Sequence, residues 1–194
     1  MRIIAGAARG RRMVAPPGLA TRPATARVRQ SIFSRLAARM SIAGARVLDL
    51  YAGSGSLGIE ALSRGAASVV FVDSSRDAGR AIERNLEQFG LRELGRLLRT
   101  EVDRAIDMLA ANAQNFDLIF IDAPFADDRS VAVARRIVEL ALLAEDGWIV
   151  VRQTERAPEF RCAGLMEVKT ASMGGHRIAL YRRAEQAPKA AAQT

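Results

Sequence analysis

The chain has 194 residues, of which 49% are hydrophobic and 26% charged, and its formal net charge at pH 7 is +8. These values suit one folded domain with a sizeable core. No apolar run approaches the roughly 18 residues of a membrane span, and the apolar run at the amino terminus is too short for a secretory signal peptide. The single cysteine, Cys162, cannot form an internal disulfide, so we expect a cytoplasmic protein in which Cys162 is an ordinary packing or surface residue.

The positive charge is concentrated in the amino-terminal segment. No acidic residue precedes Asp49, whereas ten arginines do. They are Arg2, Arg9, Arg11, Arg12, Arg22, Arg27, Arg29, Arg35, Arg39 and Arg46. A segment with charges of one sign suits a phosphate-binding surface, because each neutralised phosphate releases condensed counterions. A genome biased toward arginine explains why lysine is rare, but it does not explain why acids are missing from this segment alone.

Residues 1–45 are predicted to form a basic, RNA-binding extension of the main domain. Within it, residues 2–6 and 12–14 indicate two short strands joined by a glycine-containing turn, a small hairpin that can project from the domain. Thr25 is a suitable N-cap for the helix that follows. Apolar residues recur at helical spacing in this helix, namely Val28, Ile32, Leu36 and Met40. We expect this apolar stripe to pack on the main domain.

Residues 46–183 are predicted to form the main domain, in which strands and helices alternate. The expected strands are 47–51, 68–73, a weaker one near Leu97, 116–121 and 147–151. The expected helices contain Ile59 to Ser63, residues 76–89, Ile106 with Leu109, and residues 129–144. This alternation predicts a parallel sheet with helices on both faces. Residues 165–170 and 177–181 predict an antiparallel hairpin that closes the sheet, and we expect residues 184–194 to be a disordered tail.

A glycine-rich turn follows the first of these strands, where open parallel sheets bind ligands. It lies within residues 49–58, DLYAGSGSLG. Gly53 and Gly55 tolerate positive φ and let the backbone approach a ligand closely. Asp49, on the strand before the turn, would repel a pyrophosphate but attract an ammonium or a sulfonium group. The turn also lacks the lysine of a nucleotide phosphate loop, so these residues disfavour a dinucleotide.

Two further acids follow the next two strand segments. Asp73 lies about twenty residues beyond the glycines, where a carboxylate can accept hydrogen bonds from both hydroxyls of a ribose. Asp103 ends a third segment and could accept a hydrogen bond from an adenine amino group. Both residues could instead be caps of the helices that follow them.

The segment 117–125, DLIFIDAPF, is a strand that ends in an acid, a small residue, a proline and an aromatic residue. An exocyclic amine on a base is a poor nucleophile, because its lone pair is delocalised into the ring. The carboxylate of Asp122 and the carbonyl of Ala123 could accept its two N–H groups and fix its approach to a methyl donor. Pro124 would hold that carbonyl rigid, and Phe125 would stack on an unpaired base. The alternative is an ordinary strand end with a β-turn.

With these motifs, the chain resembles the bacterial 16S rRNA (guanine-966-N2)-methyltransferase family over nearly its whole length. The resemblance is carried by residues 2–6 (RIIAG), 21–23, 28–29, 47–66 (VLDLYAGSGSLGIEALSRGA), 71–73 and 116–125. It implies the Rossmann-like α/β fold of class I methyltransferases, with a seven-stranded, mostly parallel sheet. It also implies S-adenosylmethionine as cofactor and a guanine N2 in 16S rRNA of the assembling or assembled small subunit as acceptor. We expect a monomer that needs no metal.

The motifs and the resemblance together assign the site residues. The expected catalytic residues are Asp122, Ala123, Pro124 and Phe125. The expected cofactor-binding residues are Asp49, Tyr51, Gly53, Ser54, Gly55, Asp73, Ser74 and Asp103. The expected RNA-binding residues are Arg9, Arg11, Arg12, Arg22 and Arg29. The single histidine, His176, is expected to be structural or to contact RNA, and not to act as a base.

Three positions differ from the family pattern. Ala123 stands where the family usually has the first of two prolines, Phe125 where tyrosine is common, and Arg152 where the fifth strand often ends in an acid. An adenine-N6 DNA methyltransferase shares the catalytic block, but the small size and the lack of a separate target-recognition region count against it. An RNA-binding or ribosome-assembly factor without turnover is a second alternative, which Ala123 favours.

Overall fold

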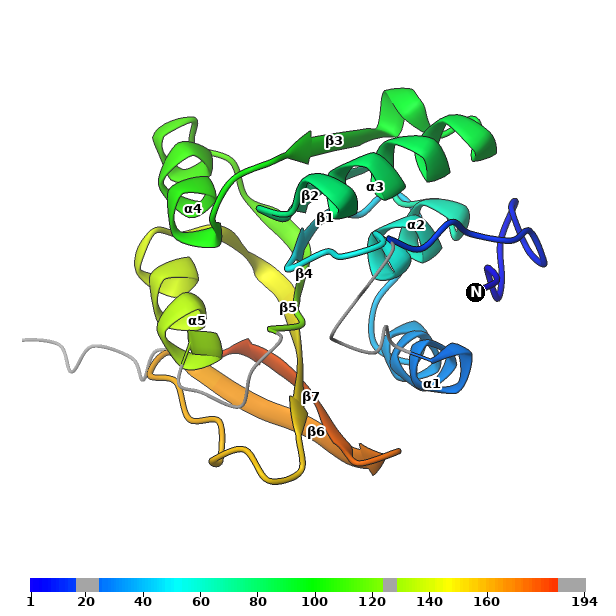
Figure 1. The fold of residues 1–194 in the computed structure, drawn as a ribbon. Coiled ribbons are helices and arrows are strands. Elements are labelled where there is room, and N and C mark those ends of the chain that lie inside the picture. Colours follow the sequence, from blue (N-terminus) through cyan, green and yellow to red (C-terminus); the bar gives the residue numbers. More distant parts are fainter. Residues whose placement is uncertain (17–24, 124–128, 185–194) are drawn as a thin grey trace, which may run out of the picture.

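The computed structural model describes residues 1–16, 25–123 and 129–184, which form one seven-stranded sheet flanked by helices (Figure 1). The helices are α1 (Ala26–Ala37), α2 (Ser56–Ser63), α3 (Arg76–Phe89), the 3-10 helix η1 (Arg92–Leu94), α4 (Val102–Ala111) and α5 (Arg129–Glu139). The strands are β1 (Arg46–Leu50), β2 (Ser68–Val72), β3 (Gly95–Leu98), β4 (Phe116–Ile121), β5 (Leu143–Thr154), β6 (Leu165–Met173) and β7 (His176–Arg183). The tail beyond Ala184 that we expected to be disordered lies outside the described residues.

The strand order is β3-β2-β1-β4-β5-β7-β6. The first five strands in this order pair in parallel, whereas β7 pairs antiparallel with both β5 and β6. The predicted parallel sheet and its closing antiparallel hairpin are thus confirmed. The chain winds outward from β1 in one direction to β2 and β3, and later in the other direction to β4 and β5. The carboxyl ends of β1 and β4 therefore form the switch point at which such sheets bind ligands.

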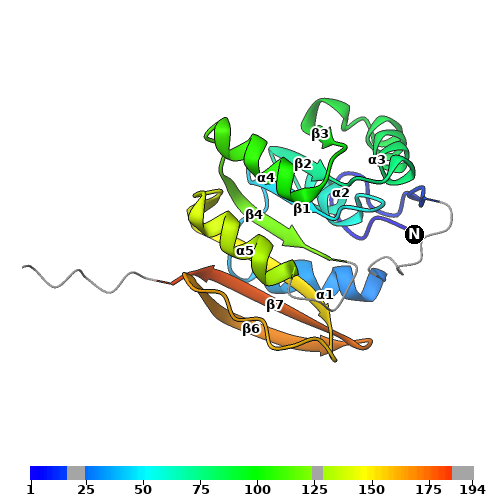
Figure 2. The same cartoon turned by 60° about the vertical axis from the view of Figure 1, so that its left-hand side comes forward.

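Two apolar clusters cover the two faces of the sheet. Helices α1, α2 and α3 lie on one face, and α4 and α5 lie on the other, as Figures 1 and 2 show from two sides. Alternate residues of a strand join opposite clusters: Val47 packs with the first set of helices, and Leu48 with the second. Burial on both faces explains why the central strands are nearly continuous apolar runs.

The predicted helix at 129–144 is too long. Helix α5 ends at Glu139, and Ala141 has a φ of +54°, which a continuing helix does not allow. The backbone N–H of Phe116 donates to the carbonyl of Leu142 over 2.8 Å, so the chain has already joined the sheet at that point. Strand β5 consequently begins at Leu143, earlier than the apolar run at 147–151 predicted.

Cys162 is buried in the apolar cluster beside α5, which agrees with the packing role expected for it. Among the described residues, no helix is long and apolar enough to cross a membrane. The same residues contain no group of three or more His, Cys, Asp and Glu side chains that could hold a metal ion.

Residues 1–16 form an amino-terminal arm that folds back on itself. Arg2 and Arg12 form an antiparallel bridge, and the N–H of Gly10 donates to the carbonyl of Ile3 over 2.9 Å. The buried apolar residues of the arm are Ile3, Ala8 and Met13. The predicted hairpin is therefore a single bridge and not a pair of strands. The arm does not project from the domain. It packs on α2 and α3, because the burial of its apolar side chains is energetically favourable.

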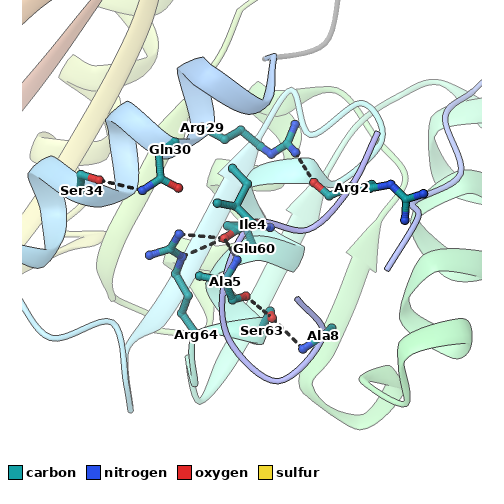
Figure 3. A network of polar contacts seen from close by, with 10 residues as sticks. All are labelled: Arg2, Ile4, Ala5, Ala8, Arg29, Gln30, Ser34, Glu60, Ser63 and Arg64. Carbon is teal, nitrogen blue, oxygen red and sulfur yellow. Dashed lines mark hydrogen bonds and ion pairs between the residues drawn. The ribbon is translucent and has the colours of Figure 1, made fainter. Parts of the chain in front are cut away.

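A buried carboxylate on α2 holds the arm in place (Figure 3). Glu60 accepts hydrogen bonds from the backbone N–H groups of Ile4, over 2.8 Å, and Ala5, over 3.0 Å. Gly6 has a φ of +83°, and a Cβ at this position would lie 1.7 Å from the carbonyl oxygen of Ser63. Only glycine allows so close an approach, so the arm is fixed to α2 as part of the domain core.

The prediction that Arg29 contacts RNA is wrong, because its side chain is completely buried beneath the arm (Figure 3). Its guanidinium donates to the carbonyl of Arg2 over 2.5 Å and to the sulfur of Met1 over 3.1 Å. Burial lowers the pKa of Arg29, and the charge of Glu60 opposes this shift. Arg29 fixes the arm to α1, which begins at the predicted Thr25 cap.

Candidate active site

The carboxyl ends of β1, β2 and β4 bring three acidic side chains to one edge of the sheet. In the parallel register, Leu50 at the end of β1 lies opposite the last residues of β2 and of β4. Asp73 and Asp122 directly follow those last residues, and Asp49 precedes Leu50. The negative charges of Asp73 and Asp122 both act on Asp49. The structure thus places side by side three acids that are far apart in the sequence.

The glycine-rich turn between β1 and α2 has backbone conformations that most side chains oppose. Tyr51, Gly53 and Gly55 all have positive φ, with values of 57°, 54° and 73°. A Cβ on Gly55 would lie 3.0 Å from the nearest side-chain atom, so the turn lies close against the core. Ser54 is buried, and its carbonyl accepts a hydrogen bond from Asn85 over 3.2 Å. These contacts give the turn a defined shape.

Asp73 links the end of β2 to this turn. One carboxylate oxygen accepts the backbone N–H of Gly53 over 2.8 Å, and the other accepts that of Ser75 over 2.9 Å. The hydroxyl of Ser75 caps α3, so the capping role considered for Asp73 is wrong. An ionised carboxylate has about four acceptor positions, so Asp73 can accept further hydrogen bonds. The neighbouring Ser74 is exposed.

Asp49 is 1% exposed and lies beneath the turn, where it accepts the backbone N–H of Gly58 over 2.9 Å. Burial raises the pKa of Asp49 well above its ordinary value. The hydrogen bond from Gly58 opposes this increase in pKa, whereas the charges of Asp122 and Asp73 add to it. Acids with so perturbed a pKa cluster at functional sites, and a cation bound nearby would favour the ionised form.

Asp122 is held by an arginine of the neighbouring strand. Nε and Nη2 of Arg152 lie 2.6 and 2.9 Å from Oδ1 and Oδ2 of Asp122. The sequence showed Arg152 only as a departure from the family pattern, and the contact follows from the parallel register of β4 and β5. Ala123 is half-buried, whereas Pro124 and Phe125 lie outside the described residues.

Asp103 does not end a strand, contrary to the sequence interpretation. It lies in the first turn of α4, and Glu101 occupies the N-cap position, so Asp103 is not the cap either. Its carboxylate is 74% exposed and pairs with Arg136 of α5 over 2.8 Å. The side chain of Asp103 therefore connects two helices.

The predicted phosphate-binding arginines of the arm differ in their surroundings. Arg9 and Arg12 are exposed, and their guanidinium groups form no hydrogen bond or ion pair with the part of the chain that the structure describes. Arg11 donates to the carbonyl of Gln88 and lies over the ring of Phe89, 4.8 Å from its centre. Arg22 lies outside the described residues.

Two buried polar residues that hold the arm, one of which also contacts the glycine-rich turn, were missed in the sequence. Asn85 donates to the carbonyl of Ser54 in the turn, and it also exchanges hydrogen bonds of 2.7 and 2.9 Å with the backbone of Val14 in the arm. Glu60 is the one charged residue in the sequence of α2, SLGIEALS. A single charged residue in a helix that is otherwise uncharged and mostly apolar indicates a buried polar contact, so this signal was available.

The strand order and the acid-lined glycine turn at the switch point define a class I methyltransferase fold. The family described as Conserved hypothetical protein 95 matches residues 1–182, and this chain belongs to that family. The resemblance to 16S rRNA methyltransferases drawn from the motifs is thereby confirmed.

Similar proteins agree with this assignment. The putative rRNA methyltransferase YlbH of Bacillus subtilis is 35% identical over 184 residues, which cover 94% of this chain and 99% of that protein. The ribosomal RNA small subunit methyltransferase D of Escherichia coli is 34% identical, over 77% of this chain and 69% of that protein. The structure of the putative methyltransferase yhhF from Escherichia coli has a TM-score of 0.79 at 30% identity, and the match covers 96% of this chain and 99% of that one.

Proposed function

We propose that this chain transfers the methyl group of S-adenosylmethionine to the N2 amine of a guanine in 16S rRNA. The observation that carries the proposal is the position of Asp122 beside Asp49 and Asp73 at the switch point of the sheet. Membership of the family, and the names of relatives that are rRNA methyltransferases, support RNA as the substrate. The choice of the guanine N2 rests on the resemblance described from the sequence.

The residues after β1 and β2 fit S-adenosylmethionine in charge and shape. Asp49 is a buried acid whose ionised form gains a partner when a sulfonium or ammonium group binds nearby. Asp73 has acceptor positions left for the ribose hydroxyls. Gly53 and Gly55 have no side chains, so their backbone can lie close to the ligand. The other predicted cofactor-binding residues, Tyr51, Ser54 and Ser74, lie in or beside the same turn.

For the adenine end we propose Glu101 in place of Asp103. Glu101 follows β3 more closely than Asp103 does, and its side chain makes no capping hydrogen bond to α4. The carboxylate of Asp103 is instead engaged with Arg136. Glu101 thus becomes the expected acceptor of the adenine amino group, directly before α4.

On the acceptor side, Asp122 and the carbonyl of Ala123 would accept the two N–H groups of the guanine amine. These contacts direct the nitrogen lone pair away from the ring and toward the methyl donor, which when bound supplies an electrophilic methyl group. Phe125 would stack on the base, since an aromatic residue three positions beyond the acid can cover an unpaired base.

We further propose that the RNA lies across the arm, with Arg9 and Arg12 on phosphates and Arg11 and Arg22 nearby. The exposed, unpaired arginines of the arm support this orientation, because phosphate contacts position RNA without reading its sequence. The substrate would be the assembling or assembled small subunit in the cytoplasm, modified by a monomer of this protein.

A methyl-transfer assay with three different acceptors distinguishes this proposal from its alternatives. The transfer of labelled methyl groups would be measured with isolated small subunits, with naked rRNA and with DNA. The proposal requires label in rRNA, and mapping in cells with and without the protein should show one modified guanine. Label in the N6 amine of DNA adenine would establish the adenine methyltransferase instead. RNA binding without transfer to any acceptor would establish an assembly factor.

A further inference from the structure

Arg152 restrains both oxygens of Asp122. Its Nε and Nη2 atoms lie 2.6 and 2.9 Å from them, and the two side chains are only 11% and 17% exposed. Ile121 and Val151 are paired in the parallel register, so Asp122 and Arg152 occupy the next level of the sheet. A planar guanidinium that binds both oxygens fixes the plane of the carboxylate as well as its position.

The surroundings of Asp122 make this restraint necessary. Asp122 lies near Asp49 and Asp73, and carboxylates in one cluster repel each other. Ala123, the next residue, places no restriction on its own φ angle comparable to that of a proline. The orientation of the Asp122 side chain therefore depends on side-chain contacts, and the contact that the structure shows is the one with Arg152.

The same contact leaves Asp122 able to act on a base. An ionised carboxylate has about four acceptor positions, and Arg152 takes one on each oxygen. We propose that Arg152 is a positioning residue of the methyl transfer, which orients Asp122 toward the acceptor amine through this two-point contact. This inference rests on the proposed function and adds to it a residue that acts only through Asp122.

The test is a double-mutant cycle on the full chain, with Arg152→Gln, Asp122→Asn and the two combined. Labelled methyl transfer to small subunits gives kcat and the KM for RNA, and calorimetry gives the Kd of S-adenosylmethionine. Arg152→Gln should lower kcat by about tenfold to a hundredfold, as misplaced reacting groups do, with KM and Kd within about twofold. Arg152→Lys should recover only part of the loss, because a lysine keeps the charge but not the fork.

The decisive comparison is made in the Asp122→Asn background. A residue that acts through Asp122 has little left to act on there, so adding Arg152→Gln should cause almost no further loss of kcat. Arg46→Gln is the matched control, since Arg46 also binds both oxygens of an aspartate, Asp117, but at the amino ends of the strands. Its kcat should equal that of the wild type.

Several results would overturn the inference. They are an unchanged or increased kcat in Arg152→Gln, an equal loss in the Asp122→Asn background, or an equal loss in Arg46→Gln. If Arg152→Gln does not fold, Arg152→Lys decides, and wild-type turnover in that variant counts against positioning. A folded wild type that methylates none of the three acceptors overturns the proposed function and this inference together. An active wild type with an unaffected Arg152→Gln overturns the inference alone.

Discussion

Two arginine–aspartate pairs lie at opposite ends of the parallel strands, and in each the guanidinium contacts both carboxylate oxygens. At the amino ends of β1 and β4, Arg46 binds the two oxygens of Asp117 at 3.0 and 2.8 Å. At the carboxyl end of β4, Arg152 of β5 binds those of Asp122 at 2.6 and 2.9 Å. Each pair joins two neighbouring strands through a forked guanidinium.

The surroundings of the two pairs differ. The side chains of Arg46 and Asp117 are 48% and 33% exposed, and exposed pairs of this kind contribute only about 0.2–1 kcal/mol to stability. Asp122 and Arg152 are mostly buried, near other acids, at the edge of the sheet where ligands bind. In the proposed function, the end of the strand at which a pair lies, and not the type of pair, decides whether the pair serves stability or chemistry.

The largest expected effect is that of removing the carboxylate of Asp122. Asp122→Ala should lower methyl transfer by about a hundredfold or more, because losing a positioned group that acts on the reacting centre costs this much. The Kd of S-adenosylmethionine, measured by calorimetry, should stay nearly unchanged. A methyl-transfer rate within a few-fold of the wild type would show that Asp122 is not part of the mechanism. Asp122 and Asp117 would then not differ in function.

A smaller loss is expected on the proposed cofactor side of the same edge. Asp73→Ala removes both the proposed acceptor for the ribose hydroxyls and the hydrogen bond from Gly53 that shapes the turn. Hydrogen bonds to charged groups are worth about 1.5–3 kcal/mol, so the affinity for S-adenosylmethionine should fall by at least about tenfold. The affinity for RNA should change less. Unchanged cofactor affinity would limit Asp73 to holding the backbone of the turn.

The raised pKa of Asp49 predicts that cofactor binding depends on pH. Burial is the main cause of the raised pKa, and the charges of Asp122 and Asp73 contribute. The protonated form of Asp49 is therefore favoured at every pH below the raised pKa, and we expect binding of a cationic cofactor to release this proton. Affinity should accordingly increase with pH, by at most about tenfold per pH unit for one proton, until the raised pKa is passed.

Calorimetry in buffers of different ionisation enthalpy, over a series of pH values above the ordinary pKa of about 4, measures this proton release directly. Asp49→Asn should bind more weakly and release no proton, with Arg152, Asp73 and Asp122 unchanged around it. Equal proton release by the wild type and the Asp49→Asn variant would show that another group is the one linked to cofactor binding.

The arginines of the arm differ from both arginine–aspartate pairs, because they are exposed and have no acidic partner among the described residues. If Arg9 and Arg12 contact phosphates, replacing both with glutamine should weaken binding of cognate and unrelated RNA alike. The slope of log K against log salt should decrease by roughly 0.7–0.9 for each lost contact. Arg11→Gln is the comparison, since Arg11 is engaged with Gln88 and Phe89 and should change the slope less. An unchanged slope in the double variant would move RNA binding to another surface.

Sequence patterns predicted the features of this molecule that depend on residues close together in the chain. The apolar strands, the Thr25 cap and the glycine turn each follow from residues close together in the chain. The strand register then brought Asp73 and Asp122 to one edge, as the parallel order required. Arg152 could be noticed in the sequence, but its contact with Asp122 depends on which strands are neighbours.

The burial of individual arginines was not revealed by the sequence. Arg29 belongs to a segment without acids, and its partners lie in the arm and in α2, far away in the sequence. The same segment contains Arg9 and Arg12, which are exposed. Composition cannot distinguish the buried arginine from the exposed ones, because an arginine is buried only where a carboxylate or carbonyl from a distant part of the sequence accepts its hydrogen bonds. The ion pair of Asp103 was missed for a related reason, since its partner Arg136 lies on another helix.

The smallest expected effect is that of Arg46→Gln, which completes the comparison of the two pairs. Hydrogen bonds from Arg46 lower the pKa of Asp117 in the folded protein. The stability from this pair is therefore present above the unfolded pKa of about 4 and is lost as the pH falls through the lowered folded pKa. Because both side chains are partly exposed, solvent reduces the contribution to about 0.2–1 kcal/mol. Urea unfolding of the wild type and of Arg46→Gln should show this difference in stability at pH 7 and low salt. The difference should shrink at about 1 M salt, where the screening length is about 3 Å. It should also shrink once the pH falls below the lowered pKa of Asp117. A difference that persists at low pH would mean that Arg46 stabilises the strand ends by packing, and that the charge of Asp117 is not the cause.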